Sequence, residues 1–242
     1  MLFSGRRFGQ GMRAAVPIWI AFVPSSIAWG IAAQTHRLPL AEVVFMSAWV
    51  YSGPAQFAVL GPLSEGRPAL QVLITGFLMN LRFLPMSAGL APYFGGTPRL
   101  KLLLASHFVS ASSFIVPYLQ FQKEASAAPS PPGAGQRNLC FFLGVGASSF
   151  LVWVAGTAAG YGFALSVPPG FEEALKFILP GYFTGLLAVE ARDRTARQIC
   201  LASLVLAVPA GAASADWGWL LSAAAVATAG WSLERWIARA SS

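Results

Sequence analysis

The polar residues that could do chemistry in this chain lie inside long apolar segments. Asn80 and Arg82 stand in GFLMNLRFLPMSAGL, and an arginine at that depth of a membrane costs several kcal/mol unless it faces a cavity or a partner. Its guanidinium can hold a carboxylate through two parallel hydrogen bonds. The pattern therefore predicts either a carboxylate site at Asn80 and Arg82 or a structural arginine that pairs with backbone carbonyls.

A second polar feature is the run YSGPAQF at the centre of another apolar segment. Pro54 lacks a backbone donor and Gly53 tolerates non-helical backbone, so the helix is predicted to break here. A broken helix frees backbone N–H and C=O groups, which is how membrane transporters bind polar solutes. Ser52, Gly53 and Gln56 are therefore candidate solute contacts.

Two further apolar segments carry proline beside small or polar residues. Pro24 and Ser25 lie in the first segment, and Pro180 and Gly181 lie at the centre of the sixth. We expect unwound backbone and solute contacts at both places. For any one segment taken singly, an ordinary proline kink, which is common in membrane helices, is the favoured explanation; the breaks taken together support a binding site equally well.

His107, in LLLASHFVSASSF, is the histidine that falls within an apolar segment. A histidine can exchange a proton near neutral pH, so His107 is a candidate proton carrier; the alternative is a neutral, hydrogen-bonded packing residue. The sequence has neither a Gly-X-Ser-X-Gly elbow nor a P-loop, which argues against an intramembrane serine enzyme and against ATP hydrolysis. We expect no metal and no cofactor, because no ligand set has metal-binding spacing.

The composition supplies the setting for these residues. Of 242 residues, 56% are hydrophobic and 10% are charged, whereas soluble domains carry about 25% charged residues. The net charge of +7 does not indicate nucleic-acid binding, because the basic residues flank apolar segments as topology-setting residues do. The expected fold is an all-α integral membrane protein, a polytopic bundle in which several helices are broken at proline or glycine.

Eight apolar segments are each long enough to cross a membrane as a helix. Fusing the last two would give seven crossings. The segments are 14–33, 40–63, 69–94, 100–121, 139–167, 171–189, 199–215 and 217–237.

Eight crossings with the N-terminus inside put most Lys and Arg residues in the cytoplasm, so both termini are predicted to be cytoplasmic. Three basic residues, Arg37, Arg99 and Lys101, then fall outside, and Arg67 falls inside. Residues 123–137, KEASAAPSPPGAGQR, form a predicted mobile loop. This loop joins halves 1–122 and 138–242 of a single transmembrane domain.

The segments around these breaks resemble a known family of bacterial permeases. The resemblance lies in AVPIWIAFVPSSIAWGIAAQ, EVVFMSAWVYSGPAQFAVL, MNLRF, SSFLVWVAGTAAG and ILPGYFTGLLA. They are similar to the AzlC family, the large subunit of branched-chain amino acid exporters of the azaleucine-resistance type. The resemblance implies location in the bacterial cytoplasmic (inner) membrane and a small AzlD-type membrane subunit as partner.

Two positions depart from the family's pattern. Relatives typically carry an Asp-Glu pair where this chain has Ser106 and His107, and a basic or aromatic polar residue where Phe83 follows Arg82. If the acidic pair carries protons in relatives, coupling differs in this chain. The resemblance therefore implies a permease more firmly than it implies the substrate.

The leading hypothesis is a secondary transporter that exports branched-chain or related small amino acids, driven by a proton gradient. Arg82 would bind the substrate carboxylate, and His107 would carry the proton. Two alternatives remain open: a permease for another small organic solute, and a membrane assembly subunit that transports nothing.

Overall fold

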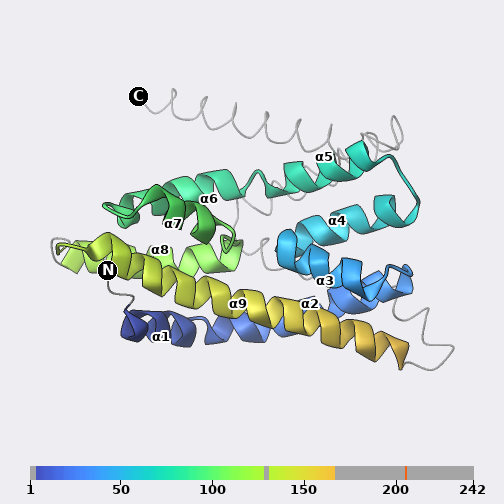
Figure 1. Cartoon of the computed structure of the whole chain (residues 1–242), viewed down its shortest axis with the longest axis horizontal. Coiled ribbons are helices and arrows are strands. Elements are labelled where there is room, and N and C mark those ends of the chain that lie inside the picture. Colours follow the sequence, from blue (N-terminus) through green and yellow to red (C-terminus); the bar gives the residue numbers. More distant parts are fainter. Residues whose placement is uncertain (1–3, 128–130, 167–204, 206–242) are drawn as a thin grey trace. The chain divides into compact units, whose positions relative to one another are not determined.

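The computed structural model describes residues 4–127, 131–166 and 205, apart from the side chain of Ser112. This part of the chain is helical, as predicted (Figure 1). Predicted segments 171–189 and 217–237 lie outside the described residues, as does 199–215 except for Val205. The elements are α1 (Gly5–Ala14), α2 (Val16–Thr35), α3 (Leu40–Trp49), α4 (Gly53–Ser64), α5 (Ala69–Asn80), α6 (Phe83–Leu90), the 3₁₀ turn η1 (Ala91–Phe94), α7 (Arg99–Ser106), α8 (Ala111–Ala127) and α9 (Ala134–Leu165).

Within the described residues, three stretches are long and apolar enough to cross a membrane. They are α2, the run from α5 through η1 (Ala69–Phe94), and α9, and they correspond to the first, third and fifth predicted segments. We call the end where α1 and η1 lie the proximal end, and the end where α2 and α9 finish the distal end (Figure 1).

Helices α2 and α9 run in the same direction and pack backbone to backbone. A Cβ atom on Gly30 would overlap the Thr157 carbonyl oxygen, and one on Gly160 would overlap the Ile27 carbonyl oxygen. Small residues let two helix backbones approach this closely, which is the main way membrane helices associate without a hydrophobic driving force between them. The pair forms a wall against which α3, α4 and α8 pack.

Helix α3 begins at the distal end and ends beside the middle of α9. The Tyr161 hydroxyl near the end of α9 donates to the Leu38 carbonyl just before α3, at 2.9 Å. At the other end of α3, the Tyr51 ring lies 5.2 Å from the ring of Phe150, three turns of α9 earlier. The run Val50–Ser52 between α3 and α4 is therefore a tip near mid-depth.

The chain reverses at this tip and returns to the distal end as α4. Tyr51 has φ of 42°, a left-handed conformation that costs a bulky residue energy and marks a constrained turn. Gly53 and Pro54 then open α4. The Phe57 ring packs 5.5 Å from the Trp29 ring, beside the distal contact of Gly30. Helices α3 and α4 thus form a re-entrant pair, the distal hairpin.

Helices α7 and α8 form a second re-entrant pair from the opposite end, the proximal hairpin. The side chain of Phe108, just after α7, lies against Gly146 in the middle of α9. Along α8 the chain then returns, since the Phe121 ring lies 5.8 Å from the ring of Phe141 near the start of α9. The two hairpins approach mid-depth from opposite ends, and the α5–α6 run crosses between the ends (Figure 1).

This arrangement corrects two predictions. Segments 40–63 and 100–121 are each predicted as one crossing, but each forms a helix pair that returns to its own end, so the described chain has three candidate spans rather than five. Hydropathy cannot separate the two cases, because both present about 20 apolar residues with a break. Residues 123–127 of the predicted loop belong to α8, and 134–137 belong to α9.

Because of the re-entrant pairs, several basic residues lie at the opposite end from the one predicted. Arg99 and Lys101, predicted outside, lie at the start of α7 and so at the proximal end, whereas Arg67, predicted inside, lies between α4 and α5 at the distal end. The described chain then has basic residues concentrated at one end, apart from Arg82 at mid-depth. The proximal end carries Arg6, Arg7, Arg13, Arg99, Lys101, Lys123 and Arg137, and the distal end carries Arg37 and Arg67.

Cysteine labelling from the two sides of the membrane tests this topology. In a background without Cys140 and Cys200, single cysteines replace Arg37, Glu65, Arg99 or Ser126. We expect an impermeant maleimide to label positions 37 and 65 from one side, and positions 99 and 126 from the other. Five successive crossings predict instead that 37 labels with 99 and that 65 labels with 126.

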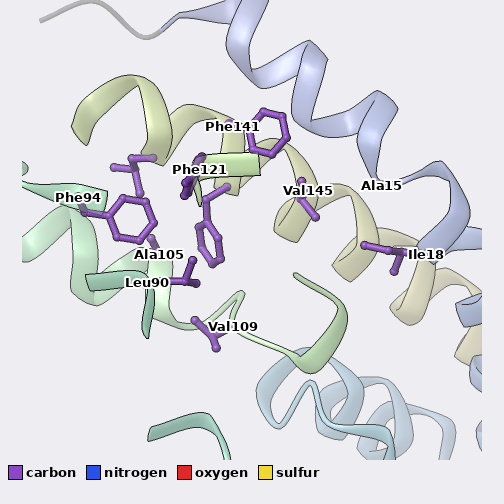
Figure 2. Packing of buried hydrophobic residues seen from close by; sticks show 11 residues of the cluster. Ala15, Ile18, Leu90, Phe94, Ala105, Val109, Phe121, Phe141 and Val145 are labelled. Atoms are coloured by element: carbon purple, nitrogen blue, oxygen red, sulfur yellow. The ribbon is translucent and has the colours of Figure 1, made fainter. Parts of the chain in front are cut away.

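The proximal end is held by an apolar cluster. Phe94 of η1, Phe121 of α8 and Phe142 of α9 pack edge to face, with ring centroids 6.0 and 5.9 Å apart from that of Phe94. Ala15 and Ile18, at the junction of α1 and α2, belong to the same buried cluster (Figure 2). The cluster fixes the proximal hairpin against both parallel helices.

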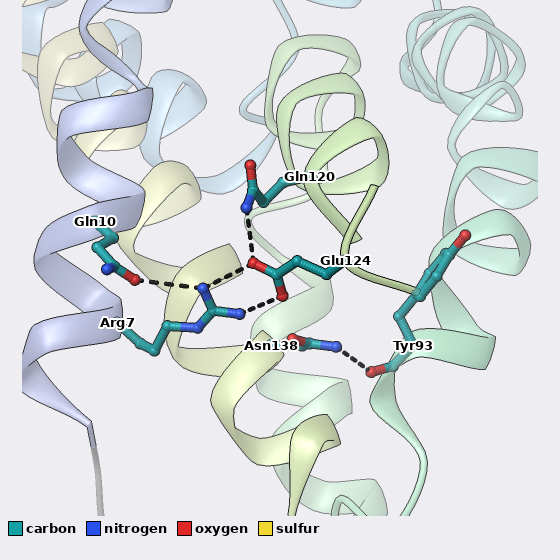
Figure 3. Close-up of polar contacts among 6 residues, drawn as sticks. All are labelled: Arg7, Gln10, Tyr93, Gln120, Glu124 and Asn138. Carbon is teal, nitrogen blue, oxygen red and sulfur yellow. Dashed lines mark hydrogen bonds and ion pairs between the residues drawn. The ribbon is translucent and has the colours of Figure 1, made fainter. Parts of the chain in front are cut away.

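An ion pair ties α1 to the proximal hairpin. The two terminal nitrogens of Arg7 donate to the two carboxylate oxygens of Glu124, at 2.9 and 2.5 Å, and Gln120 donates to the same carboxylate at 2.7 Å (Figure 3). The hydrogen bonds from Arg7 lower the pKa of Glu124 below its ordinary value. This bidentate geometry links two elements that are far apart in sequence.

The ion pair gives a pH-dependent contribution to stability. A carboxyl with a lower pKa in the folded state adds stability above its unfolded pKa and loses it as pH falls through the folded pKa. We expect Glu124→Gln to lower the free energy of unfolding near neutral pH by at most about 1 kcal/mol, since the pair is partly exposed. The difference from wild type should disappear on acidification; a difference that persists unchanged would contradict this account.

Candidate functional site

The two hairpin tips meet at the middle of α9, and the kink of the α5–α6 run contacts the distal tip. The Phe150 ring joins the tips, since it lies 5.2 Å from the Tyr51 ring and 5.6 Å from the rings of His107 and Phe108. From the kink, Arg82 Nη2 lies 3.5 Å from Ser52 Oγ at the distal tip. We call the residues of both tips, the kink and the facing part of α9 the central layer.

The kink at Leu81 and Arg82 follows from the proline downstream. Pro85 has no N–H to donate to the Leu81 carbonyl, and Leu84 N–H donates to it instead at 3.0 Å. This tighter bond interrupts the helix between Asn80 and Phe83 without unwinding it. The half-buried Arg82 guanidinium lies 5.2 Å from the centre of the Phe83 ring and reaches toward the distal tip.

The two hairpin tips differ in how their second helix begins. At the proximal tip, Ser110 and Ser113 cap α8 reciprocally, because each side chain accepts from the backbone N–H of the other at 2.7 and 3.2 Å. This is the geometry of a capping box. At the distal tip, Ser52 makes no side-chain cap on α4. The positive end of the α4 dipole therefore faces the central layer next to the Arg82 guanidinium.

Gln56 lies in a buried hydrogen-bond network behind the distal tip. Its Nε2 donates to Ser47 Oγ, and its Oε1 accepts from Trp153 Nε1, both at 3.0 Å. Ser47 Oγ also accepts from Trp29 Nε1 at 3.0 Å and lies 3.0 Å from Thr157 Oγ1. The network joins α2, α3, α4 and α9, so Gln56 holds the distal hairpin against the α2–α9 wall.

Replacing Gln56 with leucine should release the distal hairpin. The change keeps the volume but leaves the Trp153 indole N–H unsatisfied in a buried site, which costs about 1–3 kcal/mol for each orphaned group. We expect a lower melting temperature for the purified protein and faster proteolysis between α3 and α4. Gln122→Leu, on the exposed face of α8, is the matched control; equal effects of both changes would contradict this role.

Two buried oxygens near the hairpin tips and the kink have no hydrogen-bond partner among the described residues. They are Asn80 Oδ1 and Ser149 Oγ. Buried polar groups are nearly always satisfied, and exceptions often mark a place where a ligand or water completes the bonding. Ser149 was not singled out from the sequence, because a serine between apolar residues there also fits helix packing.

The remaining predicted site residues are placed as follows. Helix α2 continues through Pro24, so the prediction of unwound backbone at this position is wrong. Ser25 Oγ donates to the Ala21 carbonyl of its own helix at 3.2 Å. His107 is exposed and closes α7 at the proximal tip. Pro180 and Gly181 lie outside the described residues.

Known membrane proteins are similar to this chain over most of its length. The inner membrane protein YgaZ of Escherichia coli (strain K12) is 24% identical over 210 residues, which cover 84% of this chain and 80% of that protein. An uncharacterized membrane protein of Archaeoglobus fulgidus is 26% identical over 198 residues, which cover 81% of each chain. No solved structure matches.

The family comparison covers the described core of the fold. The AzlC protein family matches residues 17–167, a range that runs from the start of α2 to the end of α9 and contains both hairpins and the central layer. The family comprises membrane transporters rather than enzymes. By this match over more than half of its length, the chain belongs to the AzlC family.

Proposed function

We propose that this chain is the large subunit of a secondary transporter that exports branched-chain or related small amino acids across the cytoplasmic membrane. The observation that carries the proposal is Arg82, a cation near mid-depth of a kinked span, beside Ser52 at the tip of a re-entrant hairpin. An intramembrane arginine is costly and is retained for a partner or a solute.

The carboxylate of an amino acid fits this position. Arg82 would present a positive charge to the carboxylate from one side. The start of α4, which no side chain caps, would present the positive end of its helix dipole from another. A guanidinium binds a carboxylate through parallel hydrogen bonds, and a helix N-terminus adds backbone donors. Ser52 and Gly53 lie at that N-terminus, and Gln56 positions it through the buried network.

The opposed hairpins suit alternating access. Transporters bind their solute near the bilayer midplane between discontinuous helices and expose it to each side in turn. Here each tip separates the central layer from one end of the bundle. Opening the proximal hairpin would admit the solute from the basic end, which we infer to be the cytoplasmic end because basic residues are enriched on that side of membrane proteins.

Coupling and assembly complete the proposal. His107 lies at the proximal tip, and its ring is 5.6 Å from the Phe150 ring, which also contacts Tyr51. Protonation of its imidazole would therefore place a positive charge on the hairpin that opens toward the cytoplasm. The family resemblance supports a small AzlD-type membrane subunit as the obligatory partner.

Efflux from cells that lack their own exporters tests the function. Cells preloaded with labelled leucine would express this chain with the small subunit, without it, or with the small subunit alone. We expect faster efflux only with both subunits, and loss of the effect when the proton gradient is collapsed. No acceleration, with both proteins in the membrane, would exclude leucine export. Faster efflux of another organic solute under the same conditions would favour the alternative permease.

A further inference from the structure

We propose that the ion pair between Arg7 and Glu124 is the latch of the gate at the proximal end: it holds the proximal hairpin closed against α1, and it separates when that hairpin opens. The inference rests on the proposed transport function and deepens it, because it names the contact that controls access to the central layer from this end. Arg7 precedes the range 17–167 that the family comparison covers, so its role has to come from its contacts.

Helix α1 provides the fixed side of the latch. A Cβ atom on Gly11 would overlap the Phe141 carbonyl oxygen. One on Gly144 would overlap the carbonyl oxygen of Phe8. The backbones of α1 and α9 are therefore in direct contact, as small residues permit between membrane helices. The Arg7 guanidinium also lies 5.7 Å from the centre of the Phe141 ring, so Arg7 is presented to the hairpin from a helix that is fixed to α9.

Helix α8 provides the moving side. Among the α8 side chains that the structure describes, only that of Glu124 is hydrogen-bonded or ion-paired to α1, α2 or α9. Elsewhere α8 meets α9 through apolar side chains; the Phe121 ring, for example, lies 5.8 Å from the Phe141 ring. Apolar contacts are non-directional, so packed helices can shift past one another while keeping them. A bidentate ion pair is not kept in such a shift, which makes it the contact that resists opening.

The distal hairpin is held in a different way. Its tie to the α2–α9 wall is the buried network around Gln56, whose hydrogen bonds involve Ser47 and Trp153. Separating these residues would leave buried polar groups unsatisfied, which is costly. The latch is partly exposed instead, with side-chain exposures of 14% for Arg7 and 37% for Glu124, so water can replace each partner. The proximal hairpin is therefore the one that opens at the lower cost.

Each member of the pair has a neutral amide on its own helix that can keep it hydrogen-bonded after the pair separates (Figure 3). Arg7 Nη1 donates to Gln10 Oε1 of α1 at 3.3 Å. On α8, Gln120 Nε2 donates to Glu124 Oε1 at 2.7 Å. A partly buried charge that lost every partner would resist opening. With one glutamine on each side, the pair can break and re-form in every transport cycle.

Access to a buried cysteine tests the latch without any transport measurement. In a two-subunit complex free of native cysteines, Val109→Cys at the proximal tip reports on one hairpin and Val59→Cys in α4 on the other; both side chains are buried. We expect Glu124→Gln to raise the rate at which an impermeant maleimide labels position 109 from the proximal end by up to about fivefold, which corresponds to the roughly 1 kcal/mol of a partly exposed pair. Labelling of position 59 from the distal end should not change.

Charge reversal separates a latch from a general loosening of the bundle. Glu124→Arg places like charges together and should raise labelling of position 109 further. Adding Arg7→Glu restores opposite charges and should return the rate toward that of wild type. Glu65→Gln, which removes the exposed pair with Arg67 at the distal end, is the matched control and should leave both rates unchanged. Unchanged labelling of position 109 in both Glu124 variants, or equal increases at positions 109 and 59, would overturn the latch.

Cross-linking connects the latch to transport. Cysteines in place of Arg7 and Glu124 would be joined by a short bifunctional maleimide in proteoliposomes. We expect the bridge to abolish leucine counterflow, whereas the same reagent should leave each single-cysteine variant active. Counterflow that survives complete cross-linking would overturn the latch while leaving the export proposal intact. If the wild-type complex carries no leucine, the export proposal fails, and the labelling rates still decide the latch.

Discussion

Replacing Arg82 with alanine is expected to lower the kcat/KM for leucine transport by at least about 100-fold, because the carboxylate loses its charged hydrogen-bond partner. A factor of 100 corresponds to about 2.8 kcal/mol, within the range for removing one member of a buried charged pair. The variant should still insert, since removing an arginine from a span lowers the cost of insertion. Counterflow normalised to the amount of folded complex measures the effect.

Two further substitutions make the Arg82 prediction specific. Arg82→Lys should retain part of the activity, because lysine keeps the charge but lacks the planar bidentate fork. Arg67→Ala should be neutral, as Arg67 forms an exposed pair with Glu65 at the distal end, at 3.0 Å. Normal leucine transport by Arg82→Ala would remove the basis for the carboxylate site.

Gly160→Ala is expected to destabilise the bundle by about 1–3 kcal/mol, the usual cost of overpacking. The added Cβ would overlap the Ile27 carbonyl oxygen and lie 2.7 Å from its Cα, so α2 and α9 must separate. The separation would also disturb Thr157, which lies one turn earlier and joins the network that holds the distal hairpin. We therefore expect transport to fall together with the melting temperature.

The matched control lies two residues further along the same helix. A Cβ on Gly162 would meet nothing within 4 Å, and alanine is favoured over glycine in a helix by about 1 kcal/mol. Gly162→Ala should therefore be neutral or stabilising. If Gly160→Ala behaves in the same way, the close packing of α2 against α9 is not a feature of the folded protein.

The sequence predicted the breaks more accurately than it predicted the path of the chain. Gly53 and Pro54 mark the distal tip because their backbone chemistry is local. Whether the chain then crosses or turns back depends on tertiary packing of α4 against Trp29, which no local pattern encodes. Arg99 and Lys101 could have indicated the re-entrant path. Successive crossings put these two basic residues outside, against the usual enrichment of basic residues in the cytoplasm, whereas the re-entrant fold places both at the basic end.

At Pro24 the prediction of a break was itself wrong. Its surroundings predicted an opened helix, yet α2 stays continuous because it lies against α9, where small residues meet at Gly30 and Gly160. The spacing of Gly156 and Gly160 in GTAAG is a small-xxx-small pattern and could have indicated this contact.

The candidate site was predictable in part. Arg82 and Asn80 were identified because polar residues are expensive within a span. The engagement of Gln56 was not, since its partners Ser47 and Trp153 come from other helices. Ser149 was missed because only burial without a partner sets it apart from Ser148.

The most direct test of the account is leucine counterflow by the purified complex of this chain and its small subunit. Proteoliposomes loaded with unlabelled leucine would be diluted into labelled leucine, with Arg82→Ala as the comparison. We expect transient accumulation of label by wild type and none by the variant. Absence of accumulation by a folded wild-type complex, or equal accumulation by both, would contradict a leucine-carrying site at Arg82.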